Sequence, residues 1–490
     1  MGTVRQFAGY ASRSQARVSN NLGIIPAGII NIQKTFRKTE LDMYDAYYES
    51  RQYCDLQPWE MKEDSAAEYI PVRKRQPKMI YNLAKVLSSR LASKLVGKRN
   101  FPTWKIEDDP ETEDFFRLLL QSSNLRAKLI EPTRRCLNTG SVFVRVTLVN
   151  GQWKIEHFLS KWCFPEFGPT GQLEKMEVKY VYDDEEDLDE QGVPKKKWFK
   201  MEMGPVVDIM YDNPEFNSEE EEPEFEEVGR AVHGFGFVQG EWMVTAEETN
   251  NTDGPALIGD ILAFIDEINY SLSQTSEAVA YNQDPQLLLN KMDEEEINQL
   301  IRSSKKAWNL GREGEANLLE ASMSGVDAAM DFRDKIRLGV QDIVRIVMMD
   351  PEKMASHAQS GRSLEVLHGP FVELVEELQP QFESHVKNLM LKMALMVFIE
   401  NKRGNPVPIT VDPSYSPTSL NLIANFPPIF PQTMEDLQKK VSVATSAASA
   451  NIISRETMTK WLAKDFGVED IDEELSKIAN QPVINPFGAF

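Results

Sequence analysis

Residues 325–362 read GVDAAMDFRDKIRLGVQDIVRIVMMDPEKMASHAQSGR, and this stretch decides the organisation of the chain. Apolar residues recur there every three or four positions, which predicts one apolar stripe on a charged helix. The stripe is formed by Phe332, Ile336, Val340, Ile343 and Val347. Pro351 cannot continue this helix and Gly361 permits a restart, so a short polar loop should separate it from a long helical segment that begins at Ser363. Two helices that present a small loop indicate a device that contacts something passing by, and an ordinary helical hairpin is the alternative.

The length and charge of the chain limit its class. Its 490 residues, 41% of them hydrophobic, can bury a large core and form two to four domains. There are 76 acidic and 54 basic residues, which gives a formal net charge of -22. This excess argues against a protein that grips nucleic acid by broad phosphate neutralisation. The acidic runs at 183–190 and 218–227 are expected to be solvated loops.

Cysteine usage and hydropathy predict a soluble protein in a reducing setting. Cys54, Cys136 and Cys163 show no CxxC spacing, so we expect reduced core thiols and neither a disulfide framework nor a zinc site. The first residues lack the apolar core of a signal peptide. The most apolar helical run, residues 389–399, is too short to span a bilayer and contains Lys392, so no membrane association is expected.

The first half of the chain changes from a helical to a strand period. Helices are predicted at 34–53, 82–96, 113–120 and 125–137. Residues 142–148 are then rich in β-branched side chains, and Asn150-Gly151 is a hairpin turn signal before an alternating stretch at 153–158. Further strands are predicted at 176–182, 198–203 and 206–211. Residues 140–245 should therefore form a mostly antiparallel β region within a helical chain.

The second half returns to helices. A stripe of Leu257, Ile261, Ile265, Ile268 and Leu272 predicts a helix from Pro255 to about Tyr281, with Asp253 as its N-cap. A small insert follows, with a strand at 286–290, a helix at 294–306 and a glycine-rich turn at 311–314. After the long helix, 407–411 is predicted to be a short edge strand, and a helix capped by Ser454 lies near the end of the chain.

No catalytic or cofactor motif is present. There is no GxxxxGK[ST] loop, no GxSxG elbow and no HExxH, so we expect no catalytic residues and no cofactor. The histidines are scattered, and His385 has no carboxylate or cysteine at a ligand spacing, so no metal site is expected. Residues 183–190 resemble a carboxylate cluster but lack the glycine and terminal glutamate of a calcium loop. Arg302, Lys305 and Lys306 beside Trp308 could meet phosphate or an acidic partner, or form a solvated face.

The order of these parts resembles that of the tailed-bacteriophage portal proteins, the head-to-tail connectors. The matching segments extend over nearly the whole chain, and each is weak alone. They are Met43-Tyr-Asp-Ala-Tyr-Tyr-Glu-Ser, Met79-Ile-Tyr-Asn-Leu-Ala-Lys-Val-Leu, Asn138-Thr-Gly-Ser-Val-Phe-Val, Gly254 to Leu272, Gly361-Arg-Ser-Leu-Glu-Val, and Ile453-Ser-Arg-Glu-Thr-Met. Their shared order along the chain carries the resemblance. Arg362-Ser363 departs from the small residue that usually follows the glycine in this family.

The resemblance implies an α+β fold with portal-like architecture. The fold would be mainly helical, with an antiparallel β wing region, two long stem helices that bracket a small α/β clip, and a helical C-terminal crown. The implied parts are an N-terminal arm (1–30), a wing (31–253), stem helix 1 (254–281), a clip (282–323), stem helix 2 (324–349), a tunnel loop (350–361), a long wing helix (362–404) and a crown with its tail (405–490).

The resemblance also implies a function without catalysis. The chain would form a homo-oligomeric ring, of twelve subunits in the virion, at one capsid vertex and would be assembled in the host cytoplasm. Double-stranded DNA would pass through the ring during packaging and ejection. The further partners would be the terminase, the major capsid protein and the adaptor or tail proteins. Lys353, His357 and Arg362 would face DNA in the channel, and the clip residues Arg302, Lys305, Lys306 and Trp308 would contact partners.

Two other classes of function stay open at this point. A metal-dependent nucleic-acid-processing enzyme could use carboxylates such as Asp183 and Glu186. A capsid scaffold or adaptor protein is the other class, although such a protein would lack the paired long helices.

Overall fold

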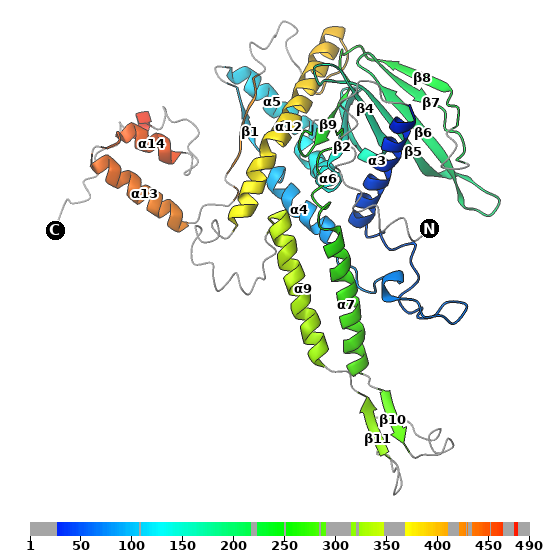
Figure 1. The fold of residues 1–490 in the computed structure, drawn as a ribbon. Helices are drawn as coiled ribbons and strands as arrows, with labels where there is room; N and C mark the ends of the chain where they lie inside the picture. Colours follow the sequence, from blue (N-terminus) through cyan, green and yellow to red (C-terminus); the bar gives the residue numbers. More distant parts are fainter. Residues whose placement is uncertain are drawn as a thin grey trace, which may run out of the picture. The chain divides into compact units, whose positions relative to one another are not determined.

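The computed structural model describes residues 27–106, 109–216, 223–248, 251–283, 286–290, 315–319, 323–346, 368–409, 421–427, 429, 434–450, 452–463 and 475–478. They belong to two compact units, one made of Met1–Ile346 with Leu374–Pro427 and the other of Val347–Glu373 with Pro428–Phe490. Helices and antiparallel strands mix in the first unit, so the predicted α+β class is confirmed (Figure 1).

Four helices precede the sheets, close to the predicted positions. They are α3 (Ala27–Tyr48), α4 (Leu83–Leu95), α5 (Pro110–Ser123) and α6 (Leu125–Thr139), which continues through Pro132. The Asn82 side chain caps α4 by accepting a hydrogen bond from the Lys85 N–H at 3.0 Å. Asp109 caps α5 in the same way, with Pro110 at the first helical position. The short η1 turn (Val72–Lys74) lies in the segment between α3 and α4.

A three-stranded antiparallel sheet lies in the first unit. Its order is β3 (Gln152–Leu159), β2 (Ser141–Val149) and β9 (Gly240–Val244). Strands β2 and β9 are largely buried, and β3 is not. The predicted turn joins β2 to β3, because Asn150 and Gly151 both adopt positive φ, at 51° and 77°. All five residues of β9 are buried, although sequence patterning did not identify this strand.

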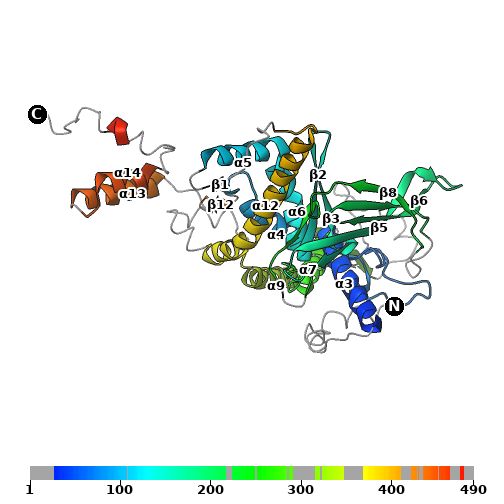
Figure 2. The ribbon, with the colours of Figure 1, turned by 90° about the horizontal axis from the view of Figure 1, so that it is seen from above.

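A five-stranded antiparallel sheet packs beside it, in the order β4-β5-β6-β7-β8. The strands are β4 (Cys163–Phe167), β5 (Leu173–Leu188), β6 (Pro194–Met203), β7 (Val207–Tyr211) and β8 (Glu227–Val232), and η2 (Ser160–Trp162) leads into β4. Met176, Val178 and Met203 pack on Phe143 and Trp242 of the three-stranded sheet. The expectation of an antiparallel region is confirmed. Figure 2 shows this sheet on the opposite side of the three-stranded sheet from α4 and α5.

The expectation of a solvated loop at 183–190 is wrong for residues 183–188, which belong to a strand. Strand β5 continues to Leu188, with Asp183 opposite Lys196 and Asp184 opposite Lys195 in β6. The acidic run fits a strand because a basic run, 195–197, lies directly across from it, and opposite charges stabilise cross-strand pairs.

Two long helices leave the sheet region together. They are α7 (Leu262–Gln283) and α9 (Met323–Val344), and strands β10 (Gln286–Asn290) and β11 (Glu315–Leu319) form an antiparallel pair between them in the chain. Helix α7 begins seven residues later than predicted, because Asp253 does not cap it and residues 257–261 form turns. Helix α9 ends at Val344 and not at 349, because Arg345 adopts φ 54°, a left-handed conformation that ends the helical hydrogen bonding.

Helix α12 (Gly369–Arg403) is the longest helix that the described residues contain. It carries buried Leu389, Met393 and Val397. The predicted edge strand at 407–411 is wrong for residues 407–409, which form no strand, while 410–411 lie outside the described residues. Instead, β12 (Ile423–Asn425) pairs with β1 (Thr103–Lys105) in an antiparallel arrangement. The sequence around β12 shows no sustained alternation of apolar and polar residues, so its pattern did not predict this strand.

The second unit contains α13 (Met434–Ser449) and α14 (Arg455–Ala463). The predicted cap of α14 is confirmed, since the Ser454 hydroxyl accepts a hydrogen bond from the Thr457 N–H at 3.1 Å.

The cysteine expectation holds for two residues of three. Cys136 and Cys163 are buried free thiols, and burial raises the pKa of both well above the usual range. Cys54 is exposed, so it is not a core thiol. Within the described parts of the chain, no helix has the length and apolarity needed to cross a membrane.

Candidate functional site

The residues that the sequence singled out for function fall outside the described residues. This applies to the three tunnel-loop residues and to the four clip residues, namely Lys353, His357, Arg362, Arg302, Lys305, Lys306 and Trp308. Their roles stay predictions. The candidate site that the structure describes is the α7–α9 pair, together with the side chains that hold it to the rest of the first unit.

Helix α9 buries a narrower stripe than expected. Ile336, Val340 and Val344 are buried, and a Cβ at Gly339 would lie 3.5 Å from Cε1 of Phe264 on α7. Phe332 and Ile343, which were assigned to the same stripe, are 52% and 43% exposed. These two lie at the edge of the stripe, roughly 60–80° around the helix from Val340, and the elements packed on α9 leave them exposed. Val347 lies outside the described residues.

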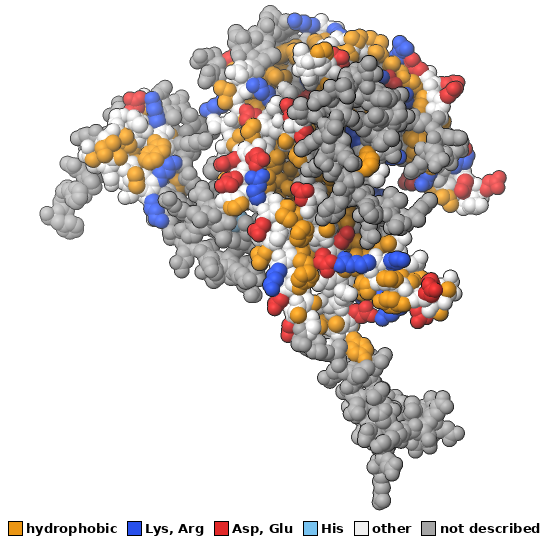
Figure 3. Space-filling view, in the orientation of Figure 1, with side chains coloured by type: hydrophobic (Ala, Val, Ile, Leu, Met, Phe, Trp, Pro, Cys, Tyr) orange, Lys and Arg blue, Asp and Glu red, His pale blue; other side chains and the backbone are white. Residues whose placement is uncertain are grey.

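The exposed side of α9 combines apolar and acidic residues. Phe332 and Ile343 lie on one flank, while Leu338, which is 58% exposed, lies roughly 120° around the helix from Phe332. Asp327 and Asp331 are exposed on the side that faces away from the buried stripe. Figure 3 shows apolar side chains gathered over α9, with charged side chains beside them. Exposed apolar residues on one flank and on the side opposite the buried stripe indicate a surface that meets other chains.

Helix α7 is fixed to the segment before α4 by buried polar contacts. The Tyr47 and Tyr53 hydroxyls donate to the Asp266 carboxylate at 2.8 and 2.6 Å. Burial raises the pKa of Asp266, while the hydrogen bonds from the two tyrosines oppose this rise. The Asn269 side chain accepts from the Tyr81 N–H at 2.7 Å and donates to the Tyr53 hydroxyl at 3.1 Å. These contacts hold α7 in one orientation at the end nearest the sheets.

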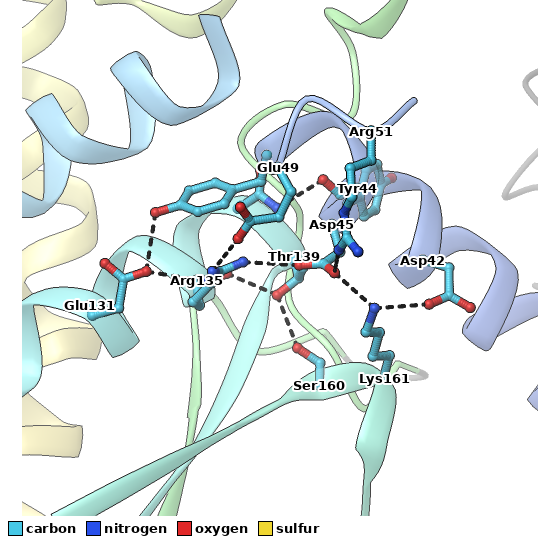
Figure 4. A network of polar contacts seen from close by, with 12 residues as sticks. Asp42, Tyr44, Asp45, Glu49, Arg51, Glu131, Arg135, Thr139, Ser160 and Lys161 are labelled. Atoms are coloured by element: carbon cyan, nitrogen blue, oxygen red, sulfur yellow. Dashed lines mark hydrogen bonds and ion pairs between the residues drawn. The ribbon is translucent and has the colours of Figure 1, made fainter. Parts of the chain in front are cut away.

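A second polar cluster joins α3 to α6 and η2 (Figure 4). The carboxylate of Asp45, which is 3% exposed, accepts from Arg135 at 3.0 Å, Lys161 at 2.8 Å and Arg51 at 3.3 Å. The Arg135 guanidinium lies 4.3 Å from the centre of the Tyr48 ring. Burial raises the pKa of Tyr48 to about 12, so its hydroxyl stays protonated at neutral pH. A buried carboxylate with three cations is satisfied, so the cluster is a structural joint between elements.

Asp253, the expected helix cap, has another role. Its carboxylate binds Arg37 through two atoms, at 2.6 and 3.0 Å, and accepts a hydrogen bond from the Ser141 hydroxyl. The same guanidinium donates to the Ser160 and Cys163 carbonyls at 3.0 Å each. Asp253 therefore links α3 to the start of β2 and β4 and contributes nothing to the α7 N-terminus.

A third cluster fixes α12 to β9. The Glu241 carboxylate accepts from Lys392 at 2.8 Å and Asn388 at 3.0 Å, and it lies 3.2 Å from Nδ1 of His385. Nε2 of His385 accepts from the Val244 N–H at 3.0 Å. Although burial opposes ionisation, the hydrogen bond from His385 and the charge of Lys392 hold the pKa of Glu241 below its usual value. No carboxylate lies at a ligand spacing from His385 in the sequence, and the carboxylate that contacts it in the fold, Glu241, is 144 residues away.

The carboxylates considered for an enzyme do not form a metal site. Asp184 and Asp187 both pair with Lys197, at 2.9 and 2.8 Å, and these hydrogen bonds lower the pKa of both carboxyl groups. Among the described residues no group of three or more histidine, cysteine, aspartate or glutamate side chains is arranged to hold a metal ion. Asp183 and Glu186, the two residues named for that alternative, lie in this same exposed, lysine-paired strand end.

Three comparisons with known proteins bear on this site. A family model described as "Phage portal protein, SPP1 Gp6-like" matches residues 28–482. Among curated proteins there is no significant match. Among solved structures, the chain is similar to a chain from the neck of an empty gene transfer agent particle computed with C6 symmetry. That chain has 10% identity, a TM-score of 0.43, and coverage of 78% of this chain and 90% of that one.

Two further similar structures come from native gene transfer agent particles. A chain of the virion has 11% identity and a TM-score of 0.40, over 78% of this chain and 89% of that one. A chain of the neck computed with C12 symmetry has 11% identity and a TM-score of 0.39, over 77% and 89%. With TM-scores below 0.5, these likenesses carry no argument, and the family match is the finding that bears on function.

Proposed function

The chain belongs to the family of SPP1 Gp6-like phage portal proteins, a structural and non-enzymatic family, and from this premise we propose that it forms a ring-shaped channel at one vertex of a phage capsid. Double-stranded DNA would enter the head through this ring during packaging and leave through it during ejection. The ring would hold about twelve copies, as the family resemblance implies, and would sit in the virion after assembly in the host cytoplasm.

The family match over residues 28–482 carries this proposal. The exposed apolar residues of α9 support the ring, because Phe332 and Ile343 lie on one flank and Leu338 lies roughly opposite the buried Val340, so two sides of the helix are left for neighbours. The formal charge of -22 supports a conduit, since acidic walls repel DNA and let it slide.

We assign the parts as the family order implies. The α7–α9 pair would be the stem, residues 282–323 the clip, 350–361 the tunnel loop, 31–253 with the long helix the wing, and 405–490 the crown. The clip would contact the terminase and later an adaptor or tail protein, through Arg302, Lys305, Lys306 and Trp308. The major capsid protein would surround the ring.

The clip assignment is tested by docking. Trp308→Ala with Lys305→Ala should leave oligomers intact and weaken capture of the terminase in a pull-down, because an aromatic anchor and a charge would be lost. Lys335→Ala on α9 removes a lysine outside the clip and should leave capture unchanged. Unchanged capture by the double variant would refute the role of these residues.

The tunnel-loop assignment is tested by packaging. Lys353, His357 and Arg362 would place sparse positive charge around the channel, and such phosphate contacts are weak and independent of sequence. Lys353→Glu should impair packaging or retention of DNA with assembly unaffected, whereas Lys353→Arg should behave like the parent. A Lys353→Glu particle that fills and holds its genome normally would refute the contact.

A further inference from the structure

A hollow of about 420 Å³ lies beside α7. The assignment of parts under the proposed function gives this hollow no role. Its walls come from the C-terminal half of α7, with Glu277 and Tyr281, and from the segment between α3 and α4, with Trp59, Lys62 and Arg75. Figures 1 and 2 both show α7 between α9 and this segment, which is drawn in blue. The hollow therefore lies on the side of α7 away from α9.

Arg75 is a buried cation with an incomplete set of partners. It is 3% exposed, and its guanidinium lies 5.2 Å from the Trp59 ring centre and 5.7 Å from that of Tyr69. It donates to the Trp59 carbonyl at 3.0 Å and to the Tyr69 hydroxyl at 3.4 Å, while its Nε has no partner. Among the described residues no carboxylate forms an ion pair with Arg75. A buried charge is costly without an anionic partner, so the hollow is suited to a carboxylate.

The one acidic side chain in the hollow is already occupied. The Glu277 carboxylate accepts from Lys62 at 2.7 Å and from the Trp59 indole at 3.2 Å. The hydrogen bond from Lys62 lowers the pKa of Glu277, and the charge of Arg75 acts in the same direction. With Arg75 and Lys62 positive and Glu277 negative, the hollow carries one net positive charge, and one further carboxylate would neutralise it.

Helix α9 offers carboxylates on the opposite side of the pair. At 100° per residue, Asp331 lies roughly opposite Val340, and Asp327 roughly 140° around from it. Both aspartates are exposed, while Val340 is fully buried. The α7–α9 pair therefore has a positively charged hollow on the outer side of α7 and exposed aspartates on the outer side of α9. These two outer sides are complementary in charge.

The hollow and Asp327 also lie at the same level along the helices. The contact of Phe264 with Gly339 fixes the antiparallel register. The hollow residues of α7 lie roughly 15–26 Å from Phe264 toward β10, at 1.5 Å per residue. Asp327 lies roughly 18 Å from Gly339 in the same direction, whereas Asp342 lies on the other side of Gly339. In a cyclic ring whose helices run along the axis, copies keep equal height, so Asp327 of one copy meets the hollow of the next.

We propose that Asp327 of one copy enters the Arg75 hollow of its neighbour, so that the hollow is a binding site for a carboxylate of a second copy of this chain. The proposal rests on the ring of the proposed function. It adds which residues meet between neighbouring copies, and that the α9 side of one copy contacts the α7 side of the next. The contact is heterologous, and a charged pair of this kind sets the register between neighbours.

A charge exchange tests the proposal without altering Arg75, whose removal could unfold the segment. Lys62→Glu turns the hollow negative at an exposed position. It should lower by about twofold or more the salt concentration at which oligomers dissociate, measured by light scattering. Adding Asp327→Lys should restore the parent value, while adding Asp342→Lys, on the same face but roughly 22 Å away, should not. Equal restoration by both second changes, or no effect of Lys62→Glu, would overturn the proposal.

A thiol cross-link gives a second, independent readout. The cross-link is made with a short bis-maleimide in a Cys54→Ser background and is examined on a denaturing gel. Lys62→Cys with Asp327→Cys should give a ladder of covalently linked oligomers. Lys62→Cys with Asp342→Cys should give only the unlinked chain. A parent chain that forms no oligomer would refute this inference together with the proposed function. Oligomers that form normally but show neither charge coupling nor the ladder would refute the inference alone.

Discussion

Replacing Glu241 by alanine should destabilise the first unit strongly, because it removes the acceptor shared by buried His385 and half-buried Asn388 and Lys392. Glu241 is 9% exposed, and its carboxylate accepts from Lys392 at 2.8 Å and from Asn388 at 3.0 Å, beside His385. After the change, Lys392 keeps only the Gly240 carbonyl, at 2.5 Å.

The expected loss is about 2–4 kcal/mol of unfolding free energy. This is at the low end of the losses seen when one partner of a buried ion pair is removed, because the Lys392 side chain is 20% exposed. Urea unfolding followed by the tryptophan fluorescence of the chain, to which Trp242 contributes from its buried position next to Glu241 in β9, measures it. Asp114→Ala is the control, since Asp114 and Arg117 form an exposed pair on α5 that should contribute less than about 1 kcal/mol.

Two further results decide whether the reasoning is right. Glu241→Ala with Lys392→Met should be less destabilised than Glu241→Ala, because it removes the orphaned cation as well. A loss for Glu241→Ala no larger than that of the control would refute the account of this cluster. Since the folded pKa of Glu241 lies below its unfolded value, its contribution is present at neutral pH and is lost as the pH falls through and below about 4.5.

The other predictions concern α7 and α9. Val340→Ala should lower the stability of the pair by about 1–2 kcal/mol in thermal or urea unfolding, because Val340 is fully buried there; an unchanged midpoint would contradict the packing. Phe332→Ser should leave that midpoint unchanged and weaken oligomer formation in light scattering, whereas Val193→Ser, equally exposed at the β5–β6 turn, should do neither. Because burial raises the pKa of Asp266, the folded chain keeps this proton longer than the unfolded chain, so this group lowers stability as the pH rises above about 3.8. Asp266→Asn should remove that part of the pH dependence, and an unchanged profile from pH 3.5 to 6 would show that Asp266 is not held as described.

The elements with strong local signals were predictable from the sequence. The Asn150-Gly151 turn, the Asn82 start of α4 and the Ser454 cap of α14 each depend on a few adjacent residues, and the structure has all three. Strand β9 was missed because all five of its residues are buried and show no alternation. The end of α9 was missed because nothing in the sequence marks Arg345 for a left-handed conformation.

The polar clusters could not be predicted for a different reason. Glu241 and His385 are 144 residues apart, and Tyr53 and Asp266 are 213 apart, so no spacing rule connects them. The only local signal is a charged residue within an apolar stretch, as Glu241 is within β9. Such a residue needs a partner when it is buried, but the sequence does not identify which one.

Negative-stain electron microscopy of the purified full chain tests the central claim most directly. The account predicts closed rings of uniform diameter with a central hole, formed from copies of the 55.8 kDa chain without any other protein. A field of single small particles at high protein concentration and low salt, matched by a mass of 55.8 kDa in light scattering, would contradict it.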